Sequence, residues 1–299
     1  MKNFLKWLLG TLGIFVLMSA FIGQDIASEE TQTVVPTPYE GISVDELVKI
    51  KYAVKYTTFA KDYYSIGNIW MVDKKGYRRH RMFARSRIIL NRPLDDLCYK
   101  DLVVMTKPQN IRGLAVLSWS YLDPEREQDI WLWLPSLKKI RKVSQASADD
   151  SFMGTDFTTE EVSVRRFEDE TYRMIGEEIF NGYHSEFNNK TYHEGLPCYV
   201  VEATPKRKNW YYSKRILWIS KEWGGCVLDE YYDRLGRKSK TLFRAYEYVK
   251  DYPAQVFLEC KDLRAEHLTV IEIEVENAEY DQGLDERFFT QKTLMRSRW

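Results

Sequence analysis

The sequence has few of the residues that build metal and redox sites. Its four cysteines, Cys98, Cys198, Cys226 and Cys260, include no CxxC pair, and its four histidines show no HExxH or His-x-His spacing. Zinc-ribbon, thioredoxin-like and zinc-protease sites are therefore excluded, and no metal or cofactor is expected. The cysteines are expected to be small buried side chains. In an oxidising compartment disulfides stay an alternative, because spacing does not reveal pairing.

The chain also lacks a net charge, because 44 lysines and arginines balance 44 aspartates and glutamates. Nucleic-acid binding is therefore not expected. The sequence contains no GxSxG motif and no phosphate-binding glycine loop. Carboxylates that could do acid/base chemistry do gather at Asp149, Asp150, Asp156, Glu160 and Glu161. The two glutamates suit the first turn of a helix, so no enzymatic activity is expected.

A single long apolar run is present, from Trp7 to Gly23, and two lysines precede it. Its length of about 17 residues is below the ~20 that a membrane-spanning helix needs. Polar residues follow, which is typical of a secretory signal at residues 1–28 and predicts export to the periplasm. An uncleaved N-terminal anchor is the alternative, because Asp25 or Ile26 stands where a signal peptidase prefers a small residue. No cysteine precedes Cys98, so the chain carries no lipobox.

Residues 29–42 are polar and contain two prolines, which indicates a linker to one domain at residues 43–299. In that domain, apolar and polar residues alternate in short segments between turn sequences, the pattern of strands with one polar face. Consecutive hairpins predict an antiparallel meander, because parallel strands would need crossover helices. The expected strands lie near residues 65–73, 77–89, 99–106, 111–121, 129–134, 138–143, 171–180, 197–204, 214–221, 226–232, 240–249, 255–261 and 268–276.

Two helix starts are also visible. Ser43 and Glu46 have the spacing of a capping box, and Thr158 and Glu161 repeat it. A sheet of this many strands curls and must close, split or be covered. The expected fold class is therefore mainly β with few helices (α+β), a curled antiparallel sheet roofed by two helices. The space between them is either a solid core or a cavity.

Three segments resemble the LolA-like family of outer-membrane lipoprotein-sorting proteins: NIRGLAVLSWSY, DIWLWLPSLKKIRKV and DSFMGTDFTTEEV. The resemblance extends from about Val44 to the FFTQKTL segment near Phe289. It implies a periplasmic antiparallel half-barrel with a helical lid, which carries acyl chains of lipoproteins or lipids toward the outer membrane. The founding carrier is shorter, and no motif places its acyl-binding arginine in this chain.

The resemblance also implies partners. An inner-membrane exporter of the RND or permease type is the expected protein partner, and an acyl chain of a lipoprotein or lipid is the expected ligand. A second function stays open, that of a periplasmic sensing or accessory binding module for a membrane transporter or regulator.

Eight apolar residues are the candidates for lining a lipid cavity of a few hundred cubic ångströms, within the ~300 to 1,000 Å³ usual for ligand sites. Five share the apolar face of expected strands, and three lie in the loop before Thr158, where Gly154 permits a tight backbone. This loop is expected to be either an acyl gate or a plug of the core. The candidates are Met82, Leu117, Trp119, Phe152, Met153, Phe157, Ile271 and Ile273.

Overall fold

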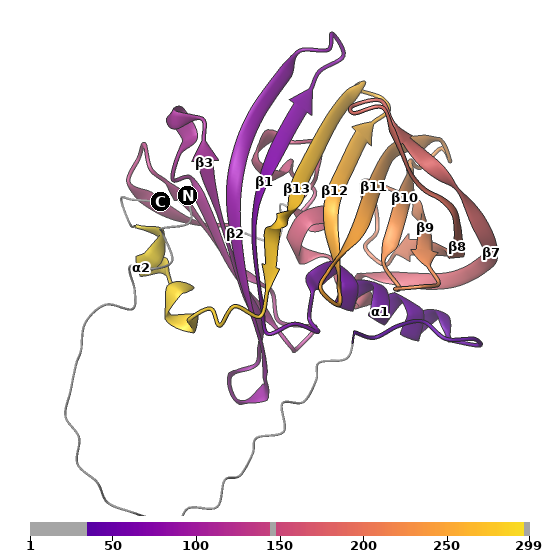
Figure 1. Ribbon diagram of the computed structural model, residues 1–299, viewed down its shortest axis with the longest axis horizontal. Coiled ribbons are helices and arrows are strands. Elements are labelled where there is room, and N and C mark those ends of the chain that lie inside the picture. Colours follow the sequence, from indigo (N-terminus) through magenta and orange to yellow (C-terminus); the bar gives the residue numbers. More distant parts are fainter. Residues whose placement is uncertain (1–34, 144–147, 296–299) are drawn as a thin grey trace, which may run out of the picture. The chain divides into compact units, whose positions relative to one another are not determined.

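Thirteen antiparallel strands form one sheet in the part of the chain that the structure describes, residues 35–143 and 148–295 (Figure 1). The structure is a computed structural model, and these residues belong to one unit, Thr33–Trp299. The strands are β1 (Asp62–Val72), β2 (Arg78–Arg92), β3 (Leu97–Lys107), β4 (Ala115–Tyr121), β5 (Asp129–Leu134), β6 (Lys139–Val143), β7 (Glu170–Ser185), β8 (Lys190–Pro205), β9 (Lys214–Ser220), β10 (Cys226–Tyr232), β11 (Lys238–Val249), β12 (Tyr252–Asp262) and β13 (His267–Tyr280). Each overlaps one predicted strand, so the predicted fold class is confirmed.

The sheet has two edges and is not closed into a barrel. Its strand order is β6-β5-β4-β3-β2-β1-β13-β12-β11-β10-β9-β8-β7. The chain therefore runs outward from β1 to one edge, crosses to the other edge, and returns to β13, which pairs with β1. The described part of the connection between the edges, residues 148–169, is called the crossover segment below.

Tight turns and one close approach fix the register of the central strands. The Asp73 carboxylate accepts hydrogen bonds from the N–H groups of Lys75 and Tyr77, which closes the β1–β2 hairpin. At Gly67 the two strands come so close that a Cβ atom would lie 2.7 Å from the Phe83 ring. The glycine is needed there because no larger side chain fits between β1 and the ring.

The longest helix, α1 (Val44–Tyr56), begins at the predicted capping box. Glu46 N–H donates to Ser43 Oγ, and Ser43 N–H donates to the Glu46 carboxylate, both at 3.3 Å. The helix buries Leu47 in an apolar cluster with residues of β8 and β9. In Figure 1 it lies across one end of the curled strands. Its last turn reaches the inner face of the sheet, where Lys55 borders a cavity.

The second predicted helix, after Thr158, is almost absent from the structure. The box between Thr158 and Glu161 exists, with Glu161 N–H donating to Thr158 Oγ1 at 3.2 Å. Only one π-helical turn follows, η6 (Glu160–Val164). The turn ends because the buried Arg165 side chain turns inward to the Glu160 carboxylate, at 2.7 Å. The predicted roof of two helices is therefore α1 together with the largely irregular crossover segment.

The remaining helical elements are short. They are η2 (Pro93–Asp95), η3 (Gln109–Ile111), η5 (Phe152–Gly154), η7 (Phe167–Asp169), η8 (Glu286–Phe288) and α2 (Gln291–Leu294). The last two belong to the C-terminal segment, residues 284–295, which packs on the face of β3–β5 that points away from the crossover segment. Phe289 and Leu294 are buried there against Leu102 and Trp131. Both faces of this part of the sheet are therefore covered.

The N-terminal segment is described only from residue 35 onward. The predicted signal at residues 1–28 lies outside the described residues, as do residues 29–34 of the expected linker. Residues 35–42 lie against the domain, where Tyr199 Oη donates to the Tyr39 carbonyl. All four cysteines are free thiols, and Cys198, Cys226 and Cys260 are buried as expected, whereas Cys98 is partly exposed. None of the helices in the described ranges is both long and apolar enough to cross a membrane.

Candidate functional site

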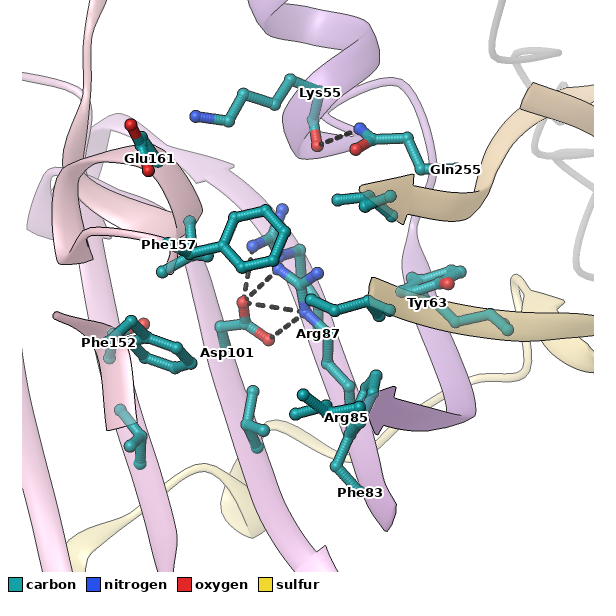
Figure 2. Close-up of a pocket in the computed structure, with 18 of the residues that line it drawn as sticks. Lys55, Tyr63, Phe83, Arg85, Arg87, Asp101, Phe152, Phe157, Glu161 and Gln255 are labelled. Atoms are coloured by element: carbon teal, nitrogen blue, oxygen red, sulfur yellow. Dashed lines mark hydrogen bonds and ion pairs between the residues drawn. The ribbon is translucent and has the colours of Figure 1, made fainter. Parts of the chain in front are cut away.

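A cavity of about 150 Å³ lies between the inner face of the sheet and the crossover segment (Figure 2). Strands from both halves of the sheet contribute to its wall, as does the last turn of α1. Phe152 and Phe157 cover it from the crossover segment, and Phe157 is only 1% exposed. The expected volume of a few hundred cubic ångströms was therefore too large, because the aromatic rings fill part of the space that the sheet encloses.

Four of the eight candidate residues line this cavity: Phe152, Phe157, Ile271 and Ile273. The inward direction of Ile271 and Ile273 agrees with the alternation on β13, where Glu274 is exposed and Glu272 accepts a hydrogen bond from Trp70 Nε1.

The other four candidates lie elsewhere. Leu117 and Trp119 point to the opposite face of β4, where Trp119 Nε1 donates to the Phe289 carbonyl. Met82 is a neighbour of Phe83, and Phe83 is the residue that lines the cavity. Met153 has a left-handed backbone (φ 53°), packs against the main apolar core, and accepts a hydrogen bond at its carbonyl from Arg81. The alternation along β4 predicted the wrong face for the cavity, because both faces of this strand are apolar: one lines the cavity and the C-terminal segment covers the other.

Charged residues on the inner face are the part of the site that sequence patterns missed. The alternation of residues 77–89 puts Arg79, Arg81, Arg85 and Arg87 on one polar face, which predicts that they are solvated. Arg85 and Arg87 instead line the cavity with Asp101 of β3 (Figure 2). The Asp101 carboxylate lies 2.7 Å from Arg85 Nη2 and 2.5 Å from Arg87 Nη2. Burial alone would raise the pKa of Asp101, but the two guanidiniums lower it to about 2. The signal was present as arginines at alternate positions of β2 facing an acid on the next predicted strand.

A second buried ion network lies behind the cavity, under α1. Arg215 is fully buried and contacts Glu170 at 2.5 Å and Asp229 at 2.8 Å. Asp229 also pairs with Arg244 of the cavity wall, at 3.3 Å. Burial opposes ionisation of Glu170, yet Arg215 and Arg165 bring its pKa down to about 2. Both carboxylates therefore stay charged as partners of buried cations.

Three of the five acids that could have suggested catalysis have structural partners, and the other two, Asp149 and Asp150, are exposed. Glu160 binds Arg165, and Glu161 binds Lys240 at 2.8 Å. Asp156 accepts a hydrogen bond from Thr269 Oγ1 at 2.6 Å, which ties the crossover segment to β13. No cluster of His, Cys, Asp and Glu suited to a metal ion occurs within residues 35–143 and 148–295. What the arrangement offers is a small, partly open space, apolar over most of its wall and charged at one end.

A family model described as "Uncharacterized protein" matches residues 98–296, well over half of the chain. The chain belongs to that family. Its fold is LolA-like, and the resemblance to the LolA-like lipoprotein-sorting proteins is confirmed. No curated protein matches the sequence.

Three solved structures show the fold of this LolA-like chain. An outer-membrane lipoprotein-sorting protein domain from Vibrio parahaemolyticus is 23% identical, with a TM-score of 0.69, over 84% of this chain and 98% of that one. A DUF1329 family protein from Desulfovibrio piger is 26% identical, with a TM-score of 0.68, over 83% and 98%. A LolA superfamily protein from Nitrosomonas europaea is 15% identical, with a TM-score of 0.59, over 84% and 99%.

Proposed function

We propose that this protein is a periplasmic carrier that binds the acyl chain of a lipoprotein or lipid and moves it toward the outer membrane without changing it. The observation that carries the proposal is the cavity between the sheet and the crossover segment, with Phe83, Phe157 and Ile271 in its wall. A concave, largely apolar space of this kind is what a ligand with a hydrocarbon chain requires. The LolA-like fold of the chain supports the same function.

The cavity in its present form takes only part of such a chain. Its 150 Å³ is about half the lower limit of usual ligand sites, ~300 Å³. Binding of a long chain therefore requires Phe152 and Phe157 to move outward with the crossover segment. Met153 and Gly154 give this segment two successive residues with positive φ, at 53° and 75°. We infer that the segment acts as a gate.

Transfer also needs a partner. Burial of an acyl chain stabilises by about 0.8 kcal/mol per methylene, and a membrane offers nearly the same. A cavity that matches the membrane gives no net direction, so direction must come from a protein at one or both ends. An inner-membrane exporter of the RND or permease type is the partner that this proposal names.

The test is binding of a fluorescent long-chain acyl probe to the delipidated protein. We expect saturable binding with one probe per chain. Val116→Trp, which replaces a small side chain of the cavity wall by an indole ring, should abolish binding while the protein stays folded. Leu235→Trp, at a position 76% exposed, is the matched control and should bind as the wild type does.

A second variant separates a gate from a plug. Phe157→Ala should lower the free energy of unfolding by about 3 kcal/mol, because a buried ring is lost. If the segment is a gate, the same change enlarges the cavity and strengthens probe binding. Loss of stability without any gain in binding would make Phe157 a core plug, and no binding to the wild type would end the carrier proposal.

A further inference from the structure

The cavity is polar at one end and apolar at the other. Phe83, Arg85 and Arg87 follow one another at alternate positions of β2 and all line the cavity. Phe83 faces Met105 across the β2–β3 ladder, whereas Arg87 faces Asp101. Lys55 and Thr57, from the end of α1, border the same cavity. The apolar wall therefore leads to a charged end formed by β2, β3 and α1 (Figure 2).

Cations outnumber carboxylates in the cavity wall. Lys55, Arg85, Arg87 and Arg244 line it, against Asp101 and Glu161. Asp101 is shared by two arginines, and Glu161 is paired with Lys240.

The partner of Arg244 does not restore the balance. Arg244 and Arg215 both form salt bridges with Asp229, so this carboxylate is also shared by two cations. The protein itself therefore supplies too few carboxylates to pair every cation at this end.

Lys55 is the basic residue of the cavity wall that has no carboxylate partner among the described residues. Its Nζ donates a hydrogen bond to Tyr56 Oη at 3.0 Å, lies 4.6 Å from the centre of the same ring, and forms no salt bridge with any of the described residues. Burial, together with the nearby charges of Lys51 and Arg165, holds the pKa of Lys55 well below its usual range. Arg87 Nε is likewise buried and has no hydrogen-bond partner in the described part of the chain. A charged ammonium without a counter-ion is costly in these surroundings, which favour the neutral amine, and an anionic ligand would favour the charged form instead.

We propose that this end of the cavity binds the anionic head of an amphiphile, held by Lys55 and the adjoining guanidiniums, with the apolar tail along Phe83 and Ile271. The inference rests on the proposed carrier function and narrows its cargo. The cargo is a lipid with a free carboxylate or phosphate next to its chain, as in a fatty acid or a phosphatidic acid. The amide- and ester-linked acyl chains of a lipoprotein anchor carry no such charge.

The experiment compares ligands that differ only in the head. Binding of palmitate, hexadecanol and hexadecyl phosphate to the delipidated full chain is measured by displacement of a neutral acyl probe. Palmitate or hexadecyl phosphate should bind about tenfold or more tighter than hexadecanol, the usual gain for hydrogen bonds to a charged group. The order of the two anions shows whether the site prefers a carboxylate or a phosphate.

Lys55→Met tests the residue. It should bring the affinity for the anions close to that for hexadecanol and leave hexadecanol binding unchanged. Lys49→Met is the matched control, because Lys49 is exposed on the same helix. Without ligand, Lys55→Met should unfold at the same or a higher temperature than the wild type, since a partly buried amino group without a carboxylate partner has been replaced by an apolar side chain.

The outcomes separate the two proposals. Equal affinity of the wild-type protein for palmitate, hexadecyl phosphate and hexadecanol would overturn the anionic cargo while the carrier proposal stands. Absence of binding by all three would overturn both. The comparison of the three ligands on the wild-type protein tests the anionic cargo even if Lys55→Met does not fold.

Discussion

At the scale of single residues, Asp101 links the cavity to the pH dependence of stability. Two guanidiniums share its carboxylate, and its pKa in the folded protein is about 2, below the ordinary value of 3.8. A pKa depressed by folding means that the carboxylate stabilises the protein above pH ~4. This stabilisation is lost as the pH falls toward 2, and the shift corresponds to about 2 kcal/mol.

Asp101→Asn should therefore lower the free energy of unfolding at pH 7 by about 3 kcal/mol, because the buried Arg87 and the partly buried Arg85 lose their shared partner. It should also flatten the acid dependence of stability between pH 4 and 2. Urea unfolding at several pH values measures both effects. Asp251→Asn, at an exposed turn, is the control. An unchanged slope in Asp101→Asn would show that other carboxylates cause the acid sensitivity.

At the scale of strands and helices, the approach of β1 to β2 depends on Gly67. A Cβ atom there would lie 2.7 Å from the Phe83 ring and 2.9 Å from the Glu272 carbonyl oxygen. Gly67→Ala should therefore cost about 1–3 kcal/mol of stability through strain. Gly176→Ala is the matched control on edge strand β7, where the nearest atom would be 3.9 Å away. Chemical denaturation compares them, and equal stability of the two variants would contradict the crowding argument.

The strands were predictable because each is bounded by its own turn signal. At Asp73–Gly76, for example, the side chain of the first residue holds the turn by local hydrogen bonds. The start of α1 was predictable for the same reason, since its capping box involves residues three apart. Local chemistry of this kind is present in the sequence itself.

The direction of side chains was less predictable, because it depends on distant segments. Leu117 and Trp119 pack under the C-terminal segment, which follows about 170 residues later in the chain. Arg85 and Arg87 looked solvated, because only the folded sheet brings Asp101 and α1 against them. The length of the helix after Thr158 likewise depended on a partner of Arg165 that the pattern did not reveal.

At the scale of the whole molecule, compartment is the first thing to test. The carrier proposal requires export, which the apolar run from Trp7 to Gly23 predicts. A fusion of residues 1–35 to a reporter that is active only outside the cytoplasm should be active. A fusion in which two leucines of the run are replaced by arginine is the control and should be inactive. Retention of the unaltered fusion in the cytoplasm would remove the basis of the carrier proposal.

The pairing of β1 with β13 has a consequence for how the chain folds. Tyr63 lies opposite Tyr280 and Val72 opposite Leu268, so the strands that join the two halves of the sheet pair residues roughly 200 positions apart. Folding rates fall as contacts become less local, because closing a long loop costs entropy before the contact forms. A ribosome must make almost the entire domain before this seam can close. The nascent polypeptide is therefore expected to stay in an unfolded, threadable state during synthesis, which is the state that a translocation pore accepts.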